Sequence, residues 1–383
     1  MTVCSPPAEA AQPLPPDRPL RLFVLGPRAF PGMQGGVEHD CEVMCAMMAE
    51  EGVDVTALTM RRYQSLHTWK GVRFIRLPTP NIQGVDKVVY NLLGTLACLW
   101  HRPDGVLVVS ITSALFLIVL RWAGIPVILR MVSRDYLHGK WGFVARQLIR
   151  WGECSGRFAH QVVCNSYSHF SYLTESRGWN NVRHVPPGMP DAEDFVPPAM
   201  DAEILGRWGL TDGGFILAVG RLTEEKGLDL LVAAFIETLP DNSLTLVVVG
   251  EGEGSYADGV RGLAVGQPQI VLAGQMLRRE IGALYRHCRL FVLPSRFEGM
   301  PNALLEAIFF DCDLLVSDIP ATQELALDPG CYFPCGDGQA LVDRLSEGAH
   351  RPRSPSDYAA IRARHDWRTA TRALITLFRE NKK

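Results

Sequence analysis

The chain alternates short, largely apolar segments with segments of helical spacing, and this alternation occurs twice. In the first half, residues 20–25, 105–110 and 125–131 are examples of the apolar segments. A strand that is apolar at nearly every position is buried on both faces, which is typical of a parallel sheet covered by helices. The sequence therefore predicts an α/β protein built on parallel sheets.

A proline-rich segment separates the two rounds of alternation. Residues 186–200 contain five prolines and three acidic residues, and such a stretch forms neither a helix nor a central strand. The chain has 383 residues, of which 47% are apolar, and a single core rarely serves more than ~250–300 residues. The predicted division is a disordered leader at 1–18, a Rossmann-like domain at 19–185, a linker at 186–200, a second such domain at 201–365 and a final helix within 366–383.

The individual elements follow from the same pattern. Strands are expected at residues 20–25, 53–58, 71–77, 105–110, 125–131 and 160–164, and after the linker at 215–219, 244–249, 270–273, 290–293 and 314–316. Helices are expected at residues 37–49, 115–122, 142–151, 228–237, 279–285 and 303–310.

The net charge of −3 is unevenly distributed. Residues 1–190 carry 19 Lys and Arg against 13 Asp and Glu, and the remaining residues carry 19 against 28. A positive first half suits an anionic partner such as a membrane surface, although solvation alone also produces uneven charge. Nucleic-acid binding is a poor fit, because the chain is net negative and contains no known recognition motif.

Cysteine usage and hydropathy indicate an intracellular protein without a metal site or a membrane span. No signal peptide precedes the ten cysteines, and the pairs Cys41/Cys45 and Cys331/Cys335 lack the further ligands of a zinc site. Residues 106–120 are uncharged, but polar residues interrupt them and a span needs ~20 residues. We expect a cytoplasmic protein, and leave open a peripheral contact with the inner face of the plasma membrane.

Two loops at expected strand ends carry residues suited to phosphate. Gly220, Arg221 and Lys226 lie between a strand and a helix, where two cations and a helix N-terminus suit a diphosphate. A solvated surface loop explains this segment equally well. Gly250, which follows the next strand in the run Gly-Glu-Gly-Glu-Gly, allows a close backbone approach to a ligand, and a tight turn is the alternative.

The most specific segment is Phe-Glu-Gly-Met-Pro-Asn-Ala-Leu-Leu-Glu-Ala at residues 297–307. Pro301 fits the first turn of a helix, which leaves the N–H groups of Asn302 and Ala303 as donors to a phosphate or a sugar hydroxyl. Glu298 precedes this helix and Glu306 lies one to two turns inside it. The two carboxylates can therefore address different parts of one extended ligand.

This segment resembles the signature of the retaining glycosyltransferases of family four, which have the GT-B fold. The resemblance covers about residues 20–380 and includes Gly220-Arg221 with Lys226, the segment 249–252, Gly35-Gly36-Val37-Glu38 and Asp366-Trp367. It implies two Rossmann-like, doubly wound domains that face each other across a cleft. The first would bind the acceptor, the second would bind the nucleotide sugar, and the final helix would cross back onto the first.

The resemblance also implies roles for single residues. Arg221 and Lys226 would bind the donor diphosphate, Glu306 the ribose hydroxyls, and Glu298 with the backbone of the following residues the donor sugar. Gly35 and Gly36 would form a flexible loop, and Gly274 to Met276 would lie beside the base. The predicted catalytic residues are Glu298, Arg221, Lys226 and His138, and the predicted donor-binding residues are Gly35, Gly36, Gly220, Gly250, Gly274, Met276, Gly299, Met300, Pro301, Asn302, Ala303 and Glu306.

The chain departs from the family pattern at several positions. Many members have a histidine at the end of a first-domain strand, whereas here the nearest histidine is His138, for which a surface or structural role is the alternative. Arg134 or Asp135 would fill the same space instead. In the second domain, Asp311 and Asp313 replace the usual glycine and proline after Glu306, and aspartate tolerates a left-handed turn. Asp318 and Glu324 are expected either near the sugar or as helix caps.

Basic and aromatic residues are mixed between Arg121 and Arg157. This stretch contains seven Lys and Arg against two acidic residues, together with Trp141, Phe143 and Trp151. Such a mixture suits docking on an anionic membrane, and the core face of a helix explains the aromatic residues equally well.

The resemblance implies retaining transfer of a hexose from a UDP- or GDP-sugar to a lipid-linked or polysaccharide acceptor in surface glycan synthesis. Fixed cations would stabilise the leaving diphosphate, so neither a metal nor another cofactor is expected. A soluble transferase acting on a small acceptor and a catalytically silent, sugar-nucleotide-binding partner subunit are the alternatives.

Overall fold

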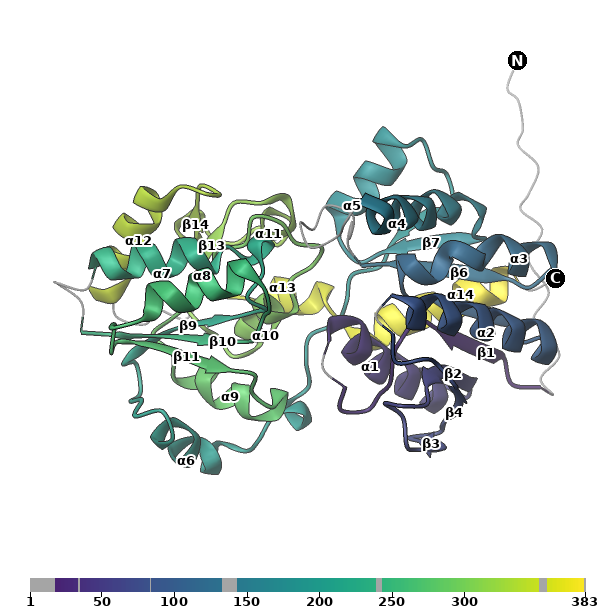
Figure 1. The fold of residues 1–383 in the computed structure, drawn as a ribbon, viewed down its shortest axis with the longest axis horizontal. Coiled ribbons are helices and arrows are strands. Elements are labelled where there is room, and N and C mark those ends of the chain that lie inside the picture. Colours follow the sequence, from purple (N-terminus) through teal and green to yellow (C-terminus); the bar gives the residue numbers. More distant parts are fainter. Residues whose placement is uncertain are drawn as a thin grey trace, which may run out of the picture.

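The computed structural model describes residues 18–33, 35–82, 84–132, 143–238, 243–350 and 357–381. Within these ranges the chain forms two lobes that lie side by side in Figure 1, each built around its own sheet. Apart from Arg18, the predicted leader lies outside the described residues.

The first lobe contains an eight-stranded sheet with the strand order β3-β4-β2-β1-β5-β6-β7-β8. All neighbouring strands are parallel except β3 and β4, which are antiparallel. The strands are β1 (Arg21–Leu25), β2 (Asp54–Met60), β3 (Thr68–Trp69), β4 (Val72–Leu77), β5 (Gly105–Val108), β6 (Val127–Met131), β7 (Gln161–Cys164) and β8 (Val182–His184). The helices are α1 (Gly36–Glu50), α2 (Val85–His101), α3 (Leu117–Trp122), α4 (Phe143–Ser155) and α5 (Tyr167–Ser171).

The second lobe contains a six-stranded, fully parallel sheet with the order β11-β10-β9-β12-β13-β14. This is the order of a doubly wound dinucleotide-binding fold. Its strands are β9 (Phe215–Val219), β10 (Thr245–Val249), β11 (Ile270–Gly274), β12 (Leu290–Leu293), β13 (Leu314–Ser317) and β14 (Tyr332–Phe333). Its helices are α6 (Asp201–Gly206), α7 (Leu228–Thr238), α8 (Ser255–Ala264), α9 (Arg278–His287), α10 (Asn302–Phe309), α11 (Pro320–Gln323), α12 (Gly338–His350) and α13 (Ala359–Arg364).

Both faces of the first sheet are covered, which explains its apolar strands. Leu22 and Val24 of β1 belong to a core that includes residues of α1, whereas Phe23 and Leu25 belong to a core that includes residues of α2, α3 and α4. Successive residues of a strand point to opposite faces. The strand must therefore be apolar at each position, as the sequence predicts.

The last helix, α14 (Trp367–Asn381), returns to the first lobe, as the resemblance implies (Figure 1). Phe378 is fully buried in the same core as Leu22 and Met44. Its ring lies so close to Gly105 that a Cβ on that glycine would meet it at 2.5 Å. The fold prediction of two doubly wound domains with a crossing helix is confirmed.

Residues 186–200 contain two short 3-10 turns rather than only extended chain, at Ala192–Asp194 and Pro198–Met200. The Met189 N–H donates to the carbonyl of His365, and the Val196 N–H donates to the carbonyl of Arg279. The segment between the lobes is therefore held against the second lobe by its backbone.

Replacing Phe378 by alanine is expected to destabilise the protein by about 3–5 kcal/mol, because the ring would leave a cavity in the core beneath α14. Urea unfolding followed by circular dichroism measures the change. Arg379 is exposed on the same helix, and Arg379→Ala is the matched control, with an expected change within about 0.5 kcal/mol. Equal effects of the two variants would contradict a packing role for α14.

Candidate active site

A cleft of about 1830 Å³ lies between the lobes and is lined by both. The second lobe contributes loops that follow β9, β10 and β12, and the first lobe contributes loops that follow β1 and β5 together with α1. In each sheet the strand order reverses next to these loops, between β1 and β5 and between β9 and β12. Ligands of such folds bind at this reversal, outside the carboxyl ends of the strands.

Most of the predicted site residues line this cleft. They are Gly35, Gly36, Gly220, Arg221, Lys226, Gly250, Met276, Glu298, Gly299, Met300, Pro301, Asn302, Ala303 and Glu306. Gly274 is not among the lining residues. It has a φ of 65° and its carbonyl accepts from the Gly250 N–H at 2.8 Å, so it forms the turn that brings Met276 to the cleft. His138, Arg134 and Asp135 lie outside the described residues.

Lys226 and Glu298 form an ion pair across the switch point of the second sheet. Lys226 Nζ lies 2.5 Å from Glu298 Oε1, and the hydroxyl of Ser295 donates to the same oxygen at 2.7 Å. Both charged side chains are largely buried, at 18% and 10% exposure. Two donors on one oxygen fix the carboxylate of Glu298, which lines the cleft.

Arg296 joins the two loops that carry this pair, and the sequence did not single it out. Its guanidinium donates to the carbonyl of Glu224 at 2.7 Å and to Asp229 Oδ2 at 2.8 Å. Burial raises the pKa of Asp229, but hydrogen bonds from Arg296 and Tyr256 outweigh it and hold that pKa below its ordinary value. The carboxylate therefore stays charged and keeps the loops after β9 and β12 together.

Arg221 is the most exposed of the predicted site cations. Its side chain is 59% exposed, and its guanidinium lies 3.6 Å from Glu225. Glu225 is largely buried, at 10% exposure, whereas the Arg221 guanidinium is open to solvent and to an anion in the cleft. Arg221 and Lys226 thus present two cations to the cleft, one exposed and one largely buried.

The N-terminus of α10 opens into the cleft. Pro301 precedes the helix as its N-cap residue, one position earlier than the predicted first turn. The N–H groups of Leu304 and Leu305 donate to the Pro301 carbonyl, whereas those of Asn302 and Ala303 have no acceptor within the helix. Both residues line the cleft, so this helix end can bind an anion or a sugar hydroxyl.

Glu306 is held by two donors that the sequence did not predict. Arg278 Nε and the hydroxyl of Tyr285 donate to its two oxygens at 3.0 and 2.9 Å. Burial and the adjacent Glu306 charge raise the pKa of Tyr285 well above its ordinary value, so its hydroxyl keeps the proton it donates. Because a carboxylate has about four acceptor positions, Glu306 retains capacity for a ligand hydroxyl.

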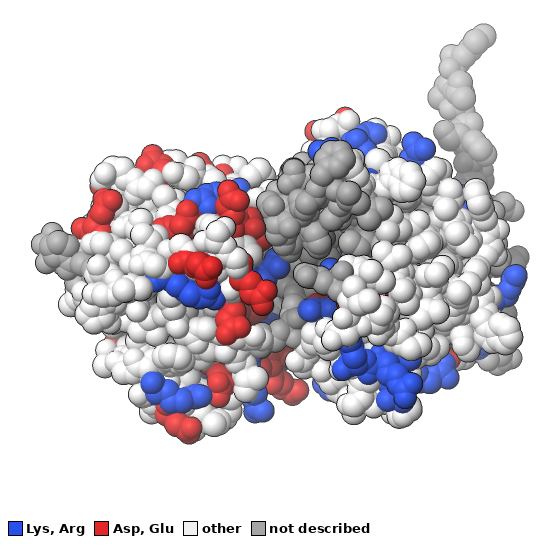
Figure 2. Space-filling model, in the orientation of Figure 1, with Lys and Arg blue, Asp and Glu red and all other residues white. Residues whose placement is uncertain are grey.

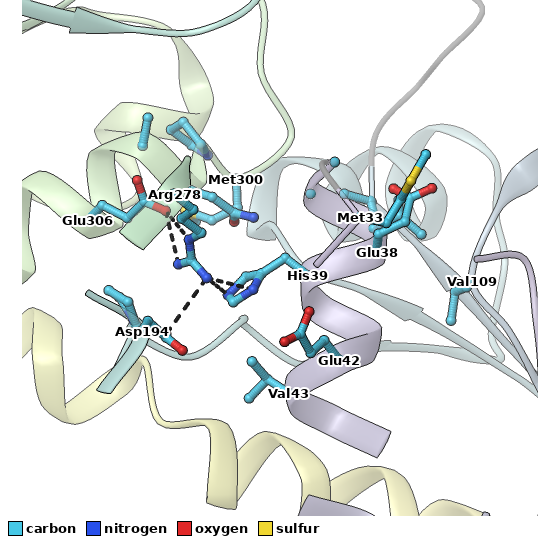
Figure 3. A pocket seen from close by; sticks show the side chains of 18 of the residues that line it. Met33, Glu38, His39, Glu42, Val43, Val109, Asp194, Arg278, Met300 and Glu306 are labelled. Carbon is cyan, nitrogen blue, oxygen red and sulfur yellow. Dashed lines mark hydrogen bonds and ion pairs between the residues drawn. The ribbon is translucent and has the colours of Figure 1, made fainter. Parts of the chain in front are cut away.

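Arg278 also reaches the first lobe (Figure 3). Its NH1 group lies 3.7 Å from Asp194 and within hydrogen-bond distance of the ring of His39, which projects from α1. Burial and the Arg278 charge lower the pKa of His39 to about 3. The imidazole is therefore neutral near pH 7 and can accept a hydrogen bond from the guanidinium.

A second contact between the lobes lies beside this one. Asp40 of α1 pairs with Arg130 of β6 at 2.5 Å, and both side chains are almost completely buried. Asn302 Nδ2 lies 3.5 Å from the other oxygen of Asp40. Arg130 holds the carboxylate of Asp40 in place and thereby supports the contact that Asn302 makes.

The glycine pair lies at this contact. Gly35 has a φ of 143°, and a Cβ on it would collide with the carboxylate of Glu38. A Cβ on Gly36 would approach Asn302 Nδ2 to 3.4 Å. Gly35 therefore favours glycine because of its backbone conformation and the adjacent Glu38, whereas a Cβ on Gly36 would be in ordinary contact with Asn302 at the N-terminus of α10.

The structure also places Asp311, Glu324 and Asp318, the other second-lobe residues considered in the sequence analysis. Asp311 has a φ of 54°, so it adopts the left-handed turn that was expected after α10. Glu324 caps a helix of the other lobe: its carboxylate accepts from the Tyr167 and Ser168 N–H groups at the start of α5 and lies 3.6 Å from His184. Asp318 accepts from the Cys335 N–H. Neither acidic residue lines the cleft.

Sequence reasoning missed several polar residues of the cleft, among them His39, Glu42 and Arg278. Burial raises the pKa of Glu42, whose carboxylate accepts from the Gly32 N–H at 3.1 Å. A cue was present, because His39 and Glu42 are three positions apart and follow the glycine pair on one helix. Arg278 had no comparable cue, since its partners lie far from it in the sequence.

Among the described residues, no group of three or more His, Cys, Asp or Glu side chains is arranged to hold a metal ion. No helix in the same ranges combines the length and the apolar composition that a membrane span requires.

Two family models match the two lobes. Residues 35–188 match the glycosyl transferase 4-like domain, and residues 213–349 match the glycosyl transferases group 1.

Two curated proteins illustrate the sequence similarity. The chain is 32% identical over 161 residues to a lipopolysaccharide core biosynthesis mannosyltransferase of Rhizobium leguminosarum, which is 40% of this chain and 45% of that protein. It is 24% identical over 323 residues to a GDP-mannose-dependent alpha-mannosyltransferase of Corynebacterium glutamicum, which is 76% of this chain and 70% of that protein. The matched part spans less than half of the first relatives found, at 45% and 38% of their lengths.

The fold has a solved counterpart. The Anabaena protein HepE, in complex with UDP and glucose, superposes with a TM-score of 0.75 at 17% identity and covers 94% of this chain and 99% of its own. At this identity the similarity concerns the fold.

The stability of the protein is expected to fall as the pH drops below about 6.5, where an unfolded histidine takes up a proton. Folded His39 resists protonation until about pH 3, so the unfolded state binds more protons between these values. His39 alone therefore lowers the free energy of unfolding by up to about 1.4 kcal/mol for each pH unit in this interval. His39→Gln should show a shallower loss of unfolding free energy between pH 7 and 5, measured by urea denaturation. His101→Gln, at an exposed histidine, is the control, and identical profiles for wild type and His39→Gln would refute the buried, neutral His39.

Proposed function

Because this chain belongs to the glycosyltransferases of family four, with the GT-B fold, we propose that it transfers a hexose from a nucleotide diphosphate sugar with retention of configuration. The acceptor is a lipid-linked or polysaccharide glycan, and the reaction takes place on the cytoplasmic side, where nucleotide sugars are made. The observation that carries the proposal is the convergence of Arg221, Lys226, Glu298 and the α10 N-terminus at one switch point.

The charges of this switch point suit a departing diphosphate. When the bond from the sugar to the diphosphate breaks, negative charge develops on the phosphate oxygens. Lys226 is fixed beside Glu298, Arg221 is exposed next to it, and the free N–H groups of Asn302 and Ala303 face the same cleft. Groups that are oriented before the reaction stabilise the developing charge without reorganising, and they require no metal for it.

The carboxylates of Glu306 and Glu298 are suited to bind the hydroxyl groups of the donor, one at the ribose and the other at the sugar. Glu306 lies deep in the cleft at 7% exposure, and its remaining acceptor positions suit the ribose hydroxyls. Glu298 lies on the loop in front of α10, next to the diphosphate cations, where it suits the hydroxyls of the sugar. In a front-face displacement the leaving phosphate oxygen accepts the proton of the attacking hydroxyl, so the reaction needs no separate base.

The names of the relatives support a hexosyl donor without selecting its base. One relative is named as a GDP-mannose-dependent enzyme, one as a mannosyltransferase of lipopolysaccharide core synthesis, and the similar fold was solved with UDP and glucose. Both UDP- and GDP-sugars therefore belong in the test.

A nucleotide diphosphate sugar is expected to raise the melting temperature of the protein, because it binds only the folded state. At a ligand concentration of 100 times Kd the stabilisation is about 2.7 kcal/mol. UDP-glucose and GDP-mannose are compared by differential scanning fluorimetry. Lys226→Ala should weaken binding at least about tenfold through loss of a charge-assisted contact, whereas Arg261→Ala, outside the cleft, should bind as wild type does. A melting temperature that no nucleotide sugar changes would contradict the proposal.

Glu298→Gln is expected to lower kcat for release of the nucleoside diphosphate by about 100-fold or more, the cost of losing one oriented polar contact to the reacting group. The amide cannot hold Lys226 as an ion pair, and it presents a donor where the sugar hydroxyls need an acceptor. A coupled assay for the nucleoside diphosphate measures the rate. Glu253 is exposed and does not line the cleft, so Glu253→Gln is the control. Wild-type kcat in Glu298→Gln would remove Glu298 from the mechanism.

A further inference from the structure

Helix α2 of the first lobe has an apolar face that no described part of the chain covers. Five large apolar side chains recur on it at intervals of three or four residues. They are Val85, Val88, Leu92, Leu96 and Trp100, with exposed fractions of 47, 44, 43, 51 and 84%. This spacing places them along one side of a helix 17 residues long. We call these five residues the α2 face.

The opposite side of α2 is already buried. Tyr90 and Cys98 belong to the core beneath the first sheet. A helix at the surface of a soluble protein normally has a polar side toward water, whereas the exposed side of α2 is apolar and its buried side includes the polar residues Asp86, Asn91 and Thr95. Helix α3 packs against it and extends the exposed apolar surface with Trp122, which is 80% exposed. In Figure 2 the right-hand lobe accordingly shows a broad surface without charged side chains.

Positive charges border the α2 face at both ends. Arg61, whose neighbour Arg62 pairs with Asp86 of α2, is exposed near its start, and Arg102 and Arg121 are exposed near its end. Between residues 61 and 122 the chain carries eight Lys and Arg against two Asp. Each of these aspartates is neutralised by an arginine, because Asp86 pairs with Arg62 and Asp104 pairs with Arg18.

The apolar face and its bordering cations together favour an anionic bilayer over a second copy of the chain as the partner of the α2 face. A second copy of the chain would bring the same row of cations against itself, which costs energy in a symmetric contact. An anionic bilayer offers acyl chains to the apolar side chains and headgroup charge to the cations, and exposed tryptophans such as Trp100 and Trp122 prefer the boundary between the two.

We propose that the α2 face docks the first lobe on an anionic lipid bilayer. The inference rests on the proposed function, for which it supplies the acceptor's location. Lys87, Tyr90 and Asn91, which lie away from the α2 face, are among the residues that line the cleft, so the helix lies between the bilayer surface and the catalytic cleft. A sugar carried on a lipid would then reach the donor from the membrane side, without leaving its headgroup layer.

The docking surface differs from the one that the sequence suggested. Of the predicted stretch between Arg121 and Arg157, Trp151 is exposed at 72% on α4, while Trp141 and the side chain of Phe143 lie outside the described residues. Arg121 is common to both surfaces. The α2 face belongs to a helix that the sequence analysis did not predict, although its apolar residues recur at helical spacing.

The test is sedimentation of the full chain with vesicles of phosphatidylcholine alone and of phosphatidylcholine with 30% phosphatidylglycerol, a composition chosen at roughly the anionic content of a bacterial leaflet. Wild type should pellet with the anionic vesicles, at least about tenfold more than with the neutral ones, and less in high salt. The variant Leu92→Gln/Leu96→Gln/Trp100→Gln should lose at least about tenfold in binding. Leu263→Gln/Val265→Gln, which removes two exposed apolar side chains from the second lobe, should pellet as wild type does.

The controls separate docking from folding and from the proposed function. Circular dichroism and nucleotide-sugar thermal shifts in the absence of vesicles should be the same for the triple variant and wild type. Docking is overturned if wild type ignores anionic vesicles, or if the triple variant still pellets fully. It is also overturned if wild type is a dimer by light scattering and the triple variant a monomer. Failure of nucleotide-sugar binding in wild type would instead count against the proposed function, whatever the vesicles show.

Discussion

Burial of both faces of each sheet is the constraint on which the rest of this structure depends. Helices cover both sides of the parallel strands, so most side chains of the strands are apolar and buried, with exceptions such as Arg130 of β6. The polar groups of the cleft therefore lie mainly on loops at the strand ends and on helix α1. In both sheets the order of strands reverses, and at each reversal two loops diverge and leave a hollow. The two hollows face each other, and their loops line one cleft.

Charged contacts connect the two lobes across that cleft. Arg278 joins Glu306 of α10 to His39 of α1, Asn302 approaches the buried Asp40–Arg130 pair, and Glu324 caps helix α5. All of these contacts are polar or charged. Water and ligands can therefore replace them more easily than they can replace the contacts of an apolar interface. The apolar crossing of α14 is of a different kind, since it fixes the end of the chain permanently in the core of the first lobe.

The sequence predicted the fold and the second-lobe loops because their signals are local. The run from Glu298 to Glu306 contains a loop, a helix start and two carboxylates within one short segment, and the structure places them along the cleft. Helix α2 was not predicted, although its exposed apolar residues recur every three or four positions. Such spacing marks one side of a helix but does not tell whether that side faces the core, and here the buried side includes polar residues. Arg278 and His39 were missed for another reason: they are 239 positions apart in the chain, and only the closed arrangement of the lobes brings them together.

The central claim is that a donor diphosphate lies between Lys226, Arg221 and the N-terminus of α10, with the ribose at Glu306. A crystal or cryo-EM structure of the protein with an unreactive UDP- or GDP-sugar analogue measures this directly. The account predicts phosphate oxygens within about 3 Å of Lys226 Nζ and of an α10 N–H group, the usual range of charge-assisted hydrogen bonds. A nucleotide bound wholly to the first lobe, or in the second lobe with its diphosphate away from Lys226, would contradict it.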